Sequence, residues 1–156
     1  MKARGYCGIG IYHPLHEENI GTLFRSAFCF EASFLFTIGK KKLPKQCTDT
    51  PNTRLHVPVF QFLSFQEFLE HLPRGAQLIG VELSPIARSL ATFCHPEQAV
   101  YLLGSEMTGL PGVILDSCQH VVQIPELRTC LNVATVGSVV LYDRQTKQTK
   151  QKEKTS

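Results

Sequence analysis

The sequence predicts an α/β protein with a mostly parallel sheet and helices on both of its faces. Short apolar runs alternate with helical stretches along the chain, which is typical of βαβ units that stack into a parallel sheet. A chain of 156 residues fits one domain and can bury an ordinary core without disulfides or metal. We therefore expect one domain over residues 1–145, followed by a polar, basic tail over residues 146–156.

The predicted elements follow one another in the order that a parallel sheet requires. Strands are predicted at six short apolar runs: Tyr6–Tyr12, Ser33–Ile38, Pro58–Phe62, Gln77–Leu83, Ala99–Leu103 and His120–Ile124. Helices are predicted between or after them at Asn19–Phe30, Ser64–His71, Pro111–Ser117 and Asn132–Tyr142.

Two of these helices carry recognisable start signals. Ser64 is followed three residues later by Glu67, which forms a capping box because the hydroxyl and the carboxylate satisfy N–H groups that the first turn leaves unpaired. Pro111 suits a first helical position, since proline lacks the N–H that would be unpaired there.

Two polar segments lie outside this pattern. Lys40–Asn52 contains four grouped lysines and is a candidate for contacting phosphates, although an ordinary solvated loop is the favoured reading. The segment Arg144–Ser156 repeats Lys, Gln and Thr without apolar periodicity, so we predict that it is disordered beyond the last helix. Its lysines would either add nonspecific RNA affinity or merely keep the chain soluble.

Composition points to a soluble, cytoplasmic protein. No apolar run reaches the roughly 18 residues of a membrane helix, and Met1–Tyr12 lacks the basic-then-apolar pattern of a signal peptide. The six cysteines form no CxxC pair and have no zinc-site spacing with the six histidines, so we expect reduced thiols and no metal. A net charge of +3 permits an anionic partner without requiring one.

The first segment with chemical potential is Asn19–Arg25, which opens a helix after a strand and a polar loop. Strand ends and helix starts are where α/β sheets bind ligands. If the helix begins after Asn19, the side chains of Asn19 and Arg25 can both reach one cleft. The alternative, a helix cap and a surface charge, is the more common outcome of such a pattern.

The second segment, Tyr101–Pro111, is an apolar strand that breaks into a glycine-rich loop and then opens a helix. Glycines there let the backbone approach a ligand closely, which suits a nucleotide-like group. The segment lacks the Gly-Lys-Ser/Thr of a P-loop and does not fit the GxGxxG fingerprint, which disfavours ATP hydrolysis and NAD chemistry. Glu106 is compatible with a sulfonium or an amine and unfavourable beside phosphates.

The third segment, Ile124–Ala134, leads from a strand into a helix of small residues. Asn132 is placed as a helix cap. The following helix is apolar nearly all round, which indicates burial on more than one face. A second protomer would supply the extra cover.

Together these segments resemble the motifs of the SpoU/TrmH methyltransferases of the SPOUT superfamily. N-x-G-x-x-x-R, L-G-S-E-x-x-G-L-P and I-P…L-N-V-A occur in that order from Cys7 to Tyr142. The resemblance implies a C-terminal trefoil knot, a rare topology that periodicity alone would not suggest. It also implies S-adenosylmethionine-dependent 2′-O-methylation of ribose, in tRNA more than rRNA, by a homodimer.

Carried over by position, the resemblance implies two sets of site residues. The polar active-site positions are Asn19, Arg25, Glu106 and Asn132. The cofactor-binding positions are Val81, Glu82, Leu83, Gly104, Ser105, Gly109, Leu110, Ile124, Leu131 and Ala134.

The polar residue types suit methyl transfer to a ribose hydroxyl, a weak nucleophile that must be held in line and relieved of its proton. We expect Arg25 to form two hydrogen bonds to an RNA phosphate and not to act as the base, because a guanidinium hardly loses a proton. Asn19 and Asn132 would orient the ribose or the cofactor loop. Glu106 would organise the pocket and not act as the base.

The third motif departs from the family pattern. Glu126 follows Pro125 where the family has methionine, the loop is shorter, and Cys130 takes the place of a serine. A thiol is a weaker donor than a hydroxyl, so either substrate choice differs or Thr129 takes the role. We expect Cys130 to be tolerated and not to be a nucleophile.

Two other functions stay open on the sequence. The altered third motif would fit a binding module that holds RNA or a nucleotide without catalysis. A thiol enzyme that pairs Cys130 with His13 or His120 is a weaker alternative, because cysteines in reduced domains are more often small buried apolar residues.

Overall fold

A seven-stranded parallel sheet forms the centre of the molecule in the computed structural model, which describes residues 5–39, 57–125 and 128–155. The strands are β1 Tyr6–Tyr12, β2 Phe34–Ile38, β3 Val59–Phe62, β4 Gln77–Val81, β5 Arg88–Ser89, β6 Gln98–Leu103 and β7 His120–Gln123, in the spatial order β3-β2-β1-β6-β4-β7-β5. All of these strand pairs are parallel, which confirms the predicted sheet. Only β5 was not predicted, since two polar residues form no apolar run.

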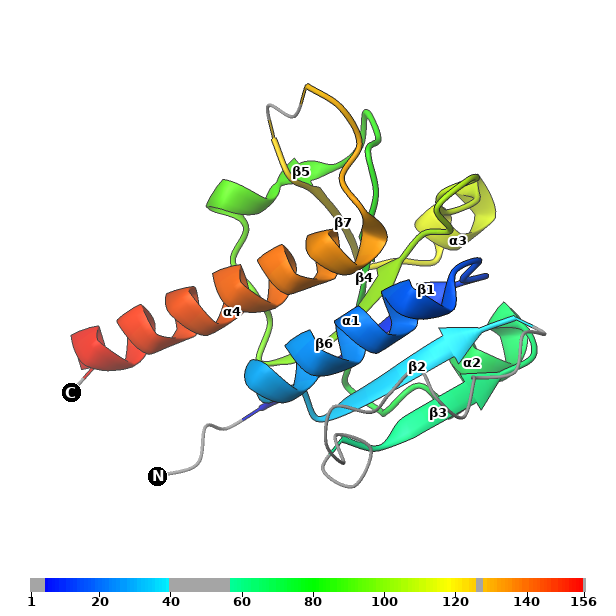
Figure 1. The fold of residues 1–156 in the computed structure, drawn as a ribbon. Coiled ribbons are helices and arrows are strands. Elements are labelled where there is room, and N and C mark those ends of the chain that lie inside the picture. The colour runs from blue at the N-terminus through cyan, green and yellow to red at the C-terminus, as the bar shows by residue number, and fades with distance from the viewer. Residues whose placement is uncertain (1–4, 40–56, 126–127, 156) are drawn as a thin grey trace.

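Helices cover both faces of the sheet (Figure 1). They are α1 Glu17–Cys29, α2 Phe65–His71, α3 Gly112–Asp116 and α4 Val133–Thr155, with a short 3-10 turn at Leu90–Thr92. Apolar side chains of α1 and α4 share one core with one face of the sheet, whereas Phe68 of α2 and Ile114 of α3 belong to a second core on the opposite face. Strand β6 contributes to both cores, which explains its continuous apolar sequence.

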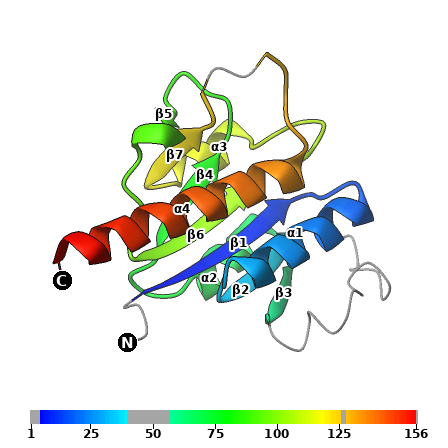
Figure 2. The ribbon, with the colours of Figure 1, turned by 60° about the vertical axis from the view of Figure 1, so that its left-hand side comes forward.

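Helices α1 and α4 lie side by side over the sheet (Figure 2). Gly137 makes their close approach possible, because a Cβ at this position would lie 2.4 Å from Leu23 Cδ1 and 3.0 Å from Leu103 Cδ1. The Ser26 and Ser138 hydroxyls form a 2.6 Å hydrogen bond across the same contact. Small residues in α4 therefore let it pack tightly onto both α1 and β6.

The far end of α4 differs from its prediction. The helix continues through Thr155, where a disordered tail was expected. Arg144 is only 5% exposed and donates to the Pro96 and Glu97 carbonyls at 2.5 and 2.7 Å. Lys147 Nζ donates to the Leu90 carbonyl at 2.6 Å. Polar anchors thus hold a stretch that has no apolar periodicity, and its Lys and Gln residues are good helix formers.

Two helix starts also refine the predictions. Helix α1 begins at Glu17, two residues before Asn19. Helix α3 begins at Gly112, so Pro111 is its N-cap and not its first helical residue. The capping box of α2 is confirmed in part: Ser64 Oγ accepts from Glu67 N at 3.1 Å, while Glu67 Oε2 accepts from Leu63 N at 2.6 Å, one residue before the expected position.

Some sequence expectations concern features that the structure does not test. The lysine-rich loop Lys40–Asn52 lies outside the described residues, and so does Glu126. The trefoil knot stays a prediction, because strand order does not define how the chain is threaded. No helix in the described part of the chain has both the length and the apolar character that crossing a membrane requires.

Candidate active site

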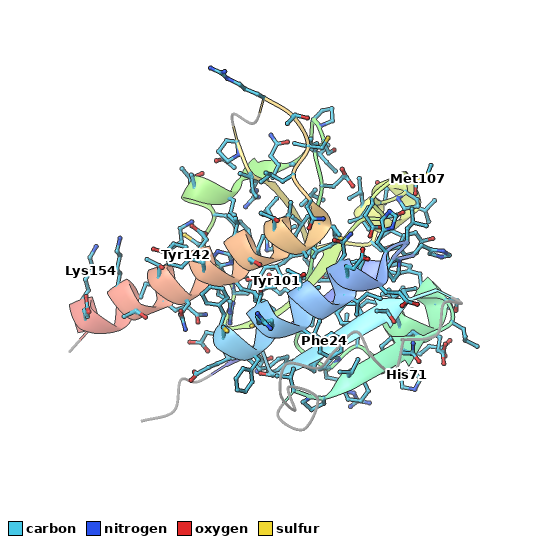
Figure 3. All side chains as sticks on the ribbon, in the orientation of Figure 1. Phe24, His71, Tyr101, Met107, Tyr142 and Lys154 are labelled. Carbon is cyan, nitrogen blue, oxygen red and sulfur yellow. The ribbon has the colours of Figure 1, made fainter. Side chains whose placement is uncertain are left out.

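A cavity of about 610 Å³ opens at the carboxyl ends of β4, β6 and β7. Its walls come from residues 81–83 after β4, 103–109 after β6, 123–124 after β7, 130–133 and 136 around the start of α4, and from His16 and Asn19 at the start of α1. This edge of a parallel sheet is where α/β proteins bind ligands. Met107, labelled in Figure 3, is 82% exposed on the glycine-rich loop that forms part of the wall.

Three polar residues from distant motifs meet at this cavity. Asn19 Nδ2 donates to Glu106 Oε1 at 2.8 Å, and Asn132 Nδ2 donates to Asn19 Oδ1 at 2.7 Å. Asn19 and Asn132 are 113 residues apart in the chain, so this hydrogen-bonded row exists only in the folded state. The structure therefore brings three of the four predicted polar residues together.

Asn132 also caps α4. Its Oδ1 accepts from the backbone N–H of Ala134 at 2.9 Å and of Thr135 at 3.2 Å. The predicted capping role is thus confirmed, and the same side chain donates to Asn19. The side-chain oxygen of Asn132 therefore caps the start of α4, while its side-chain nitrogen holds Asn19 in the polar row.

Glu106 holds the two sides of the cavity together as an acceptor. Besides Asn19, its carboxylate accepts from the Leu15 N–H at 3.1 Å and the His16 N–H at 3.4 Å. Partial burial raises the pKa of Glu106, but the hydrogen bonds from Asn19 and from backbone N–H groups outweigh burial, so the pKa lies below its ordinary value. A carboxylate with lowered pKa and several fixed donors is suited to organising a site and poorly suited to removing a proton.

The glycine-rich loop turns back on itself below the cavity. Ser105 and Gly109 form an antiparallel bridge, and Gly109 has a positive φ of 63°, which favours glycine. A Cβ on Gly104 would lie 2.6 Å from the Gly109 carbonyl carbon. The loop is therefore compact only because both positions lack a side chain.

Eight of the ten predicted cofactor residues line the cavity: Val81, Glu82, Leu83, Gly104, Ser105, Gly109, Ile124 and Leu131. Leu110 and Ala134 do not. The Leu110 side chain packs into the core on the α2 and α3 face, and Ala134 is fully buried in the core under α1 and α4. Both follow lining residues directly in the sequence, and the turn of the chain carries their side chains away from the cavity.

Arg25 is not among the residues that line the cavity. Because α1 begins at Glu17, Asn19 and Arg25 lie on the same helix. Six residues at about 100° each place them roughly 120° apart around the axis. Asn19 is buried at the cavity, whereas Arg25 is exposed on the outer side of α1. The expectation that both reach one cleft within the chain is therefore wrong.

Met107 and Thr108 also line the cavity, within the glycine-rich loop that was predicted to hold the cofactor. Other lining residues were not predicted: His16, Leu103, Gln123, Val133 and Val136. Most of them sit next to motif positions at strand or helix ends, and that adjacency was an available signal. His16 had none, since it precedes its motif and is the N-cap of α1 without a side-chain capping bond.

Cys130 lies in the cavity wall and is exposed. Thr129 beside it is also exposed but is not among the residues that line the cavity. Neither His13 nor His120 lines this cavity, and the His120 ring instead bonds Gln77 Oε1 at 2.8 Å. The five described cysteines are free thiols, and in the described part of the chain no group of three His, Cys, Asp or Glu side chains could hold a metal ion. The geometry gives a thiol enzyme built on those histidines no support.

The cavity fits a nucleoside-sized ligand. Its volume falls within the roughly 300–1,000 Å³ of small-molecule sites. Apolar side chains such as Val81, Ile124 and Leu131 alternate with glycine-rich backbone and a few polar groups. This combination suits S-adenosylmethionine, which has a flat base, a ribose and a charged amino-acid end.

Known proteins share this architecture. The mouse (Mus musculus) tRNA (guanosine(18)-2′-O)-methyltransferase TARBP1 is 28% identical over 137 residues, which cover 80% of this chain and 8% of that protein. The crystal structure of the SpoU methyltransferase AviRb from Streptomyces viridochromogenes in complex with AdoMet has a TM-score of 0.82 and 21% identity, over 93% of this chain and 58% of AviRb. This chain thus spans only part of each of these two proteins.

A third similar protein is matched along almost its whole length. Its structure concerns the 2′-OH methylation of C/U34 on tRNA, and it superposes with a TM-score of 0.81 and 26% identity over 94% of this chain and 99% of that chain. The model of the SpoU rRNA Methylase family matches residues 8–142. Because this match includes all but the first two residues of the strands, the residues that line the cavity and all three motifs, the chain belongs to the SpoU rRNA Methylase family.

Proposed function

We propose that the chain is an S-adenosylmethionine-dependent RNA 2′-O-ribose methyltransferase, with tRNA favoured over rRNA as substrate. The observation that carries the proposal is the row Asn19, Glu106 and Asn132 at the edge of a nucleoside-sized cavity in a SpoU-family chain. Mouse TARBP1 and the protein solved for C/U34 methylation, both named for 2′-O-methylation of tRNA, support the reaction and the preferred RNA.

The cavity residues divide into those that hold the cofactor and those that organise the RNA. Backbone and apolar groups around Val81, Gly104 and Leu131 would hold S-adenosylmethionine, which supplies an electrophilic methyl group. Asn19 and Asn132 would orient the ribose, and Glu106 keeps both sides of the site in place through its fixed donors.

Arg25 is proposed to position an RNA phosphate. Its guanidinium can form two parallel hydrogen bonds to phosphate oxygens. Since Arg25 does not line the cavity of its own chain, the proposed role requires the cavity of a second protomer.

A homodimer through α1 and α4 would meet that requirement. The outer sides of these helices carry Tyr142, which is 59% exposed, and Phe28, which is 47% exposed and follows the exposed Arg25 by three residues in α1. Aromatic residues beside arginine are enriched in protein interfaces. A second copy seated on this surface would cover the aromatic groups and bring Arg25 to the partner's site.

The experiment is transfer of labelled methyl groups from S-adenosylmethionine to purified tRNA and, in parallel, to rRNA, both taken from cells that lack the gene. We expect label in tRNA at a phosphodiester bond that resists alkaline hydrolysis, as bonds next to a 2′-O-methyl group do. Binding of S-adenosylmethionine by calorimetry without transfer to either RNA would overturn the enzyme and favour the binding module. No cofactor binding at all would overturn the enzyme and leave only a binding module that holds RNA without the cofactor.

A further inference from the structure

Glu82 directly follows β4, which lies between β6 and β7 in the sheet. The cavity opens at the ends of these three strands. Its carboxylate joins two loops. Oε1 accepts from the Leu83 N–H at 2.9 Å, and Oε2 accepts from the Leu110 N–H at 2.7 Å. The side chain thus connects the end of β4 with the end of the glycine-rich loop and forms part of the cavity wall.

The carboxylate lies directly against Gly109. A Cβ on Gly109 would be 2.4 Å from Glu82 Oε2 and 3.0 Å from its Cδ, closer than real side-chain atoms approach. Gly109 is therefore needed for two reasons, its positive φ and the space that Glu82 occupies. Such close packing fixes the position of the carboxylate in the wall.

The two acidic side chains in the wall differ in how much of their acceptor capacity the protein uses. Glu106 accepts from three groups outside its own residue, Leu15 N, His16 N and Asn19 Nδ2. Glu82 accepts one N–H on each oxygen. A carboxylate has about four acceptor sites, so each Glu82 oxygen can take one further donor.

We propose that the Glu82 carboxylate binds the 2′- and 3′-hydroxyls of the cofactor's ribose and selects for an intact vicinal diol. The inference rests on the proposed function, because it needs a nucleoside in this cavity. A diol presents two adjacent O–H donors, and a carboxylate at a strand end that holds ribose hydroxyls is a general solution for nucleotide recognition in α/β folds. Hydrogen bonds to a charged acceptor are the strong ones, which makes the contact selective.

The test uses S-adenosylhomocysteine and its 2′-deoxy and 3′-deoxy analogues, with affinity measured by calorimetry on the full chain. For the wild type we expect each deoxy analogue to bind about 10- to 100-fold more weakly, the range for a lost hydrogen bond to a charged group. For Glu82→Gln we expect the deoxy analogues to bind within about threefold of S-adenosylhomocysteine, since the charged partner has been removed. An unchanged deoxy penalty in this variant would overturn the inference.

Glu67→Gln is the matched control. Glu67 is also a carboxylate that accepts a backbone N–H, from Leu63, and it is not among the residues that line the cavity. This variant should keep the wild-type penalty. The competing possibility is that Glu82 binds the ammonium group at the amino-acid end of the cofactor. The ligand 5′-methylthioadenosine tests it, because this ligand lacks the amino-acid end. If Glu82→Gln removes only the preference for S-adenosylhomocysteine over 5′-methylthioadenosine, Glu82 binds the ammonium and the inference is wrong.

A second variant covers the case in which Glu82→Gln does not fold. Gly109→Ala keeps the carboxylate but places a methyl group against Oε2, and should also shrink the deoxy penalty. Thermal unfolding of both variants shows which one is interpretable. Wild-type protein that binds no nucleoside would contradict the proposed function itself, whereas binding with an unaltered penalty in the variant contradicts only the role of Glu82.

Discussion

Glu106 joins the loop before α1 to the glycine-rich loop, with a sequence separation of up to 91 residues between bonded groups. Its hydrogen bonds come from N–H groups, which require an acceptor and stabilise the ionised form. Neither Glu106 nor Arg25 is a suitable base, so the contribution proposed for each is positioning. That assignment leads to kinetic expectations that differ from those for acid–base catalysis.

For Glu106→Gln we expect kcat/KM for methyl transfer to fall by about 10- to 100-fold, because one amide oxygen cannot replace a carboxylate that accepts from three donors. The shape of the pH–rate profile should not change. The measurement is kcat/KM between about pH 4 and 9 for wild type and variant, because the ionisation of a carboxylate with a lowered pKa lies at the acidic end of this range. Loss of the acidic limb of the profile in the variant would identify Glu106 as the base instead.

Arg25→Ala should reduce methyl transfer by about 100-fold or more while S-adenosylmethionine affinity stays within about threefold, since a bidentate phosphate contact is lost and the cavity is intact. Initial rates and calorimetry on the same preparation test both parts. Arg74→Ala, which removes another exposed arginine, is the control and should behave as wild type. Equal loss of binding and transfer would place Arg25 in cofactor binding.

Cys130→Ser restores the residue that the family pattern has at this position. We expect transfer within about threefold of wild type or faster, because a hydroxyl is the better hydrogen-bond donor and no step needs a thiolate. Single-turnover rates with the preferred RNA are the measurement. Loss of methyl transfer by Cys130→Ser in a single turnover would show that the thiol takes part in the reaction.

At the scale of elements, α4 links the cavity to the opposite end of the sheet. Asn132 caps its first turn, and Arg144 and Asp143 lie in a polar cluster near the start of β6. In that cluster Arg144 donates to Tyr101 Oη at 3.3 Å. The Asp143 carboxylate can only accept, so His95 Nε2–H donates to it at 2.8 Å. Because the pKa of His95 is lowered, the ring is neutral, and its Nδ1 then accepts from the Tyr101 hydroxyl at 2.6 Å.

This network predicts a pH dependence of stability. Burial, with the charges of Arg144 and Lys147, lowers the pKa of His95 despite its bond to Asp143. Because the unfolded chain binds the proton more readily, the His95 contribution is complete above the ordinary pKa of 6.5 and is lost as pH falls from there through the lowered pKa. His95→Gln should show a smaller loss in the free energy of unfolding between about pH 7.5 and 5.5.

Urea unfolding at several pH values is the measurement. The control is His71→Gln, which replaces an exposed histidine that also bonds a neighbour, the Glu67 carbonyl. This control should follow the wild-type pH profile. A His95→Gln profile that parallels the wild type would mean that other groups determine the dependence.

The sequence predicted the elements well where one physical signal dominated. Apolar runs located six of the seven strands, but β5 is held by pairing with β7 and has no signal of its own. The far part of α4 depends on contacts of Arg144 and Lys147 with distant carbonyls, which a polar sequence does not reveal. Tertiary hydrogen bonds, and not periodicity, determine both.

The site was predictable to a similar degree. Motif order located the loops, and eight of ten cofactor positions do line the cavity. Leu110, Ala134 and Arg25 do not, because a motif defines a position in the chain and not the side to which its side chain points. For Arg25, the earlier start of α1 places Asn19 on the same helix, so the two side chains lie roughly 120° apart around its axis.

At the scale of the whole molecule, Arg25 lies away from the cavity of its own chain, and its proposed role requires a second protomer. A chain of 17.5 kDa should therefore run as a dimer of about twice that mass in light scattering at micromolar concentration. Phe28→Glu should yield a folded monomer that binds S-adenosylmethionine but transfers no methyl group, since the exposed aromatic surface would be charged. A wild-type monomer with full activity would contradict this arrangement.

Mixing two inactive variants tests whether Arg25 acts across that dimer. Arg25→Ala has an intact cavity without its arginine, and Asn132→Ala has the arginine beside an altered cavity. If Arg25 serves the partner's cavity, exchange of subunits creates mixed dimers with one complete site, because a twofold interface places each residue equivalently on both chains. About half of the dimers are then mixed and one of their two sites is complete, so roughly a quarter of wild-type activity returns. If Arg25 serves its own chain, every site in the mixture lacks one component and no activity returns. The outcome decides whether the two protomers share catalytic groups or only a surface.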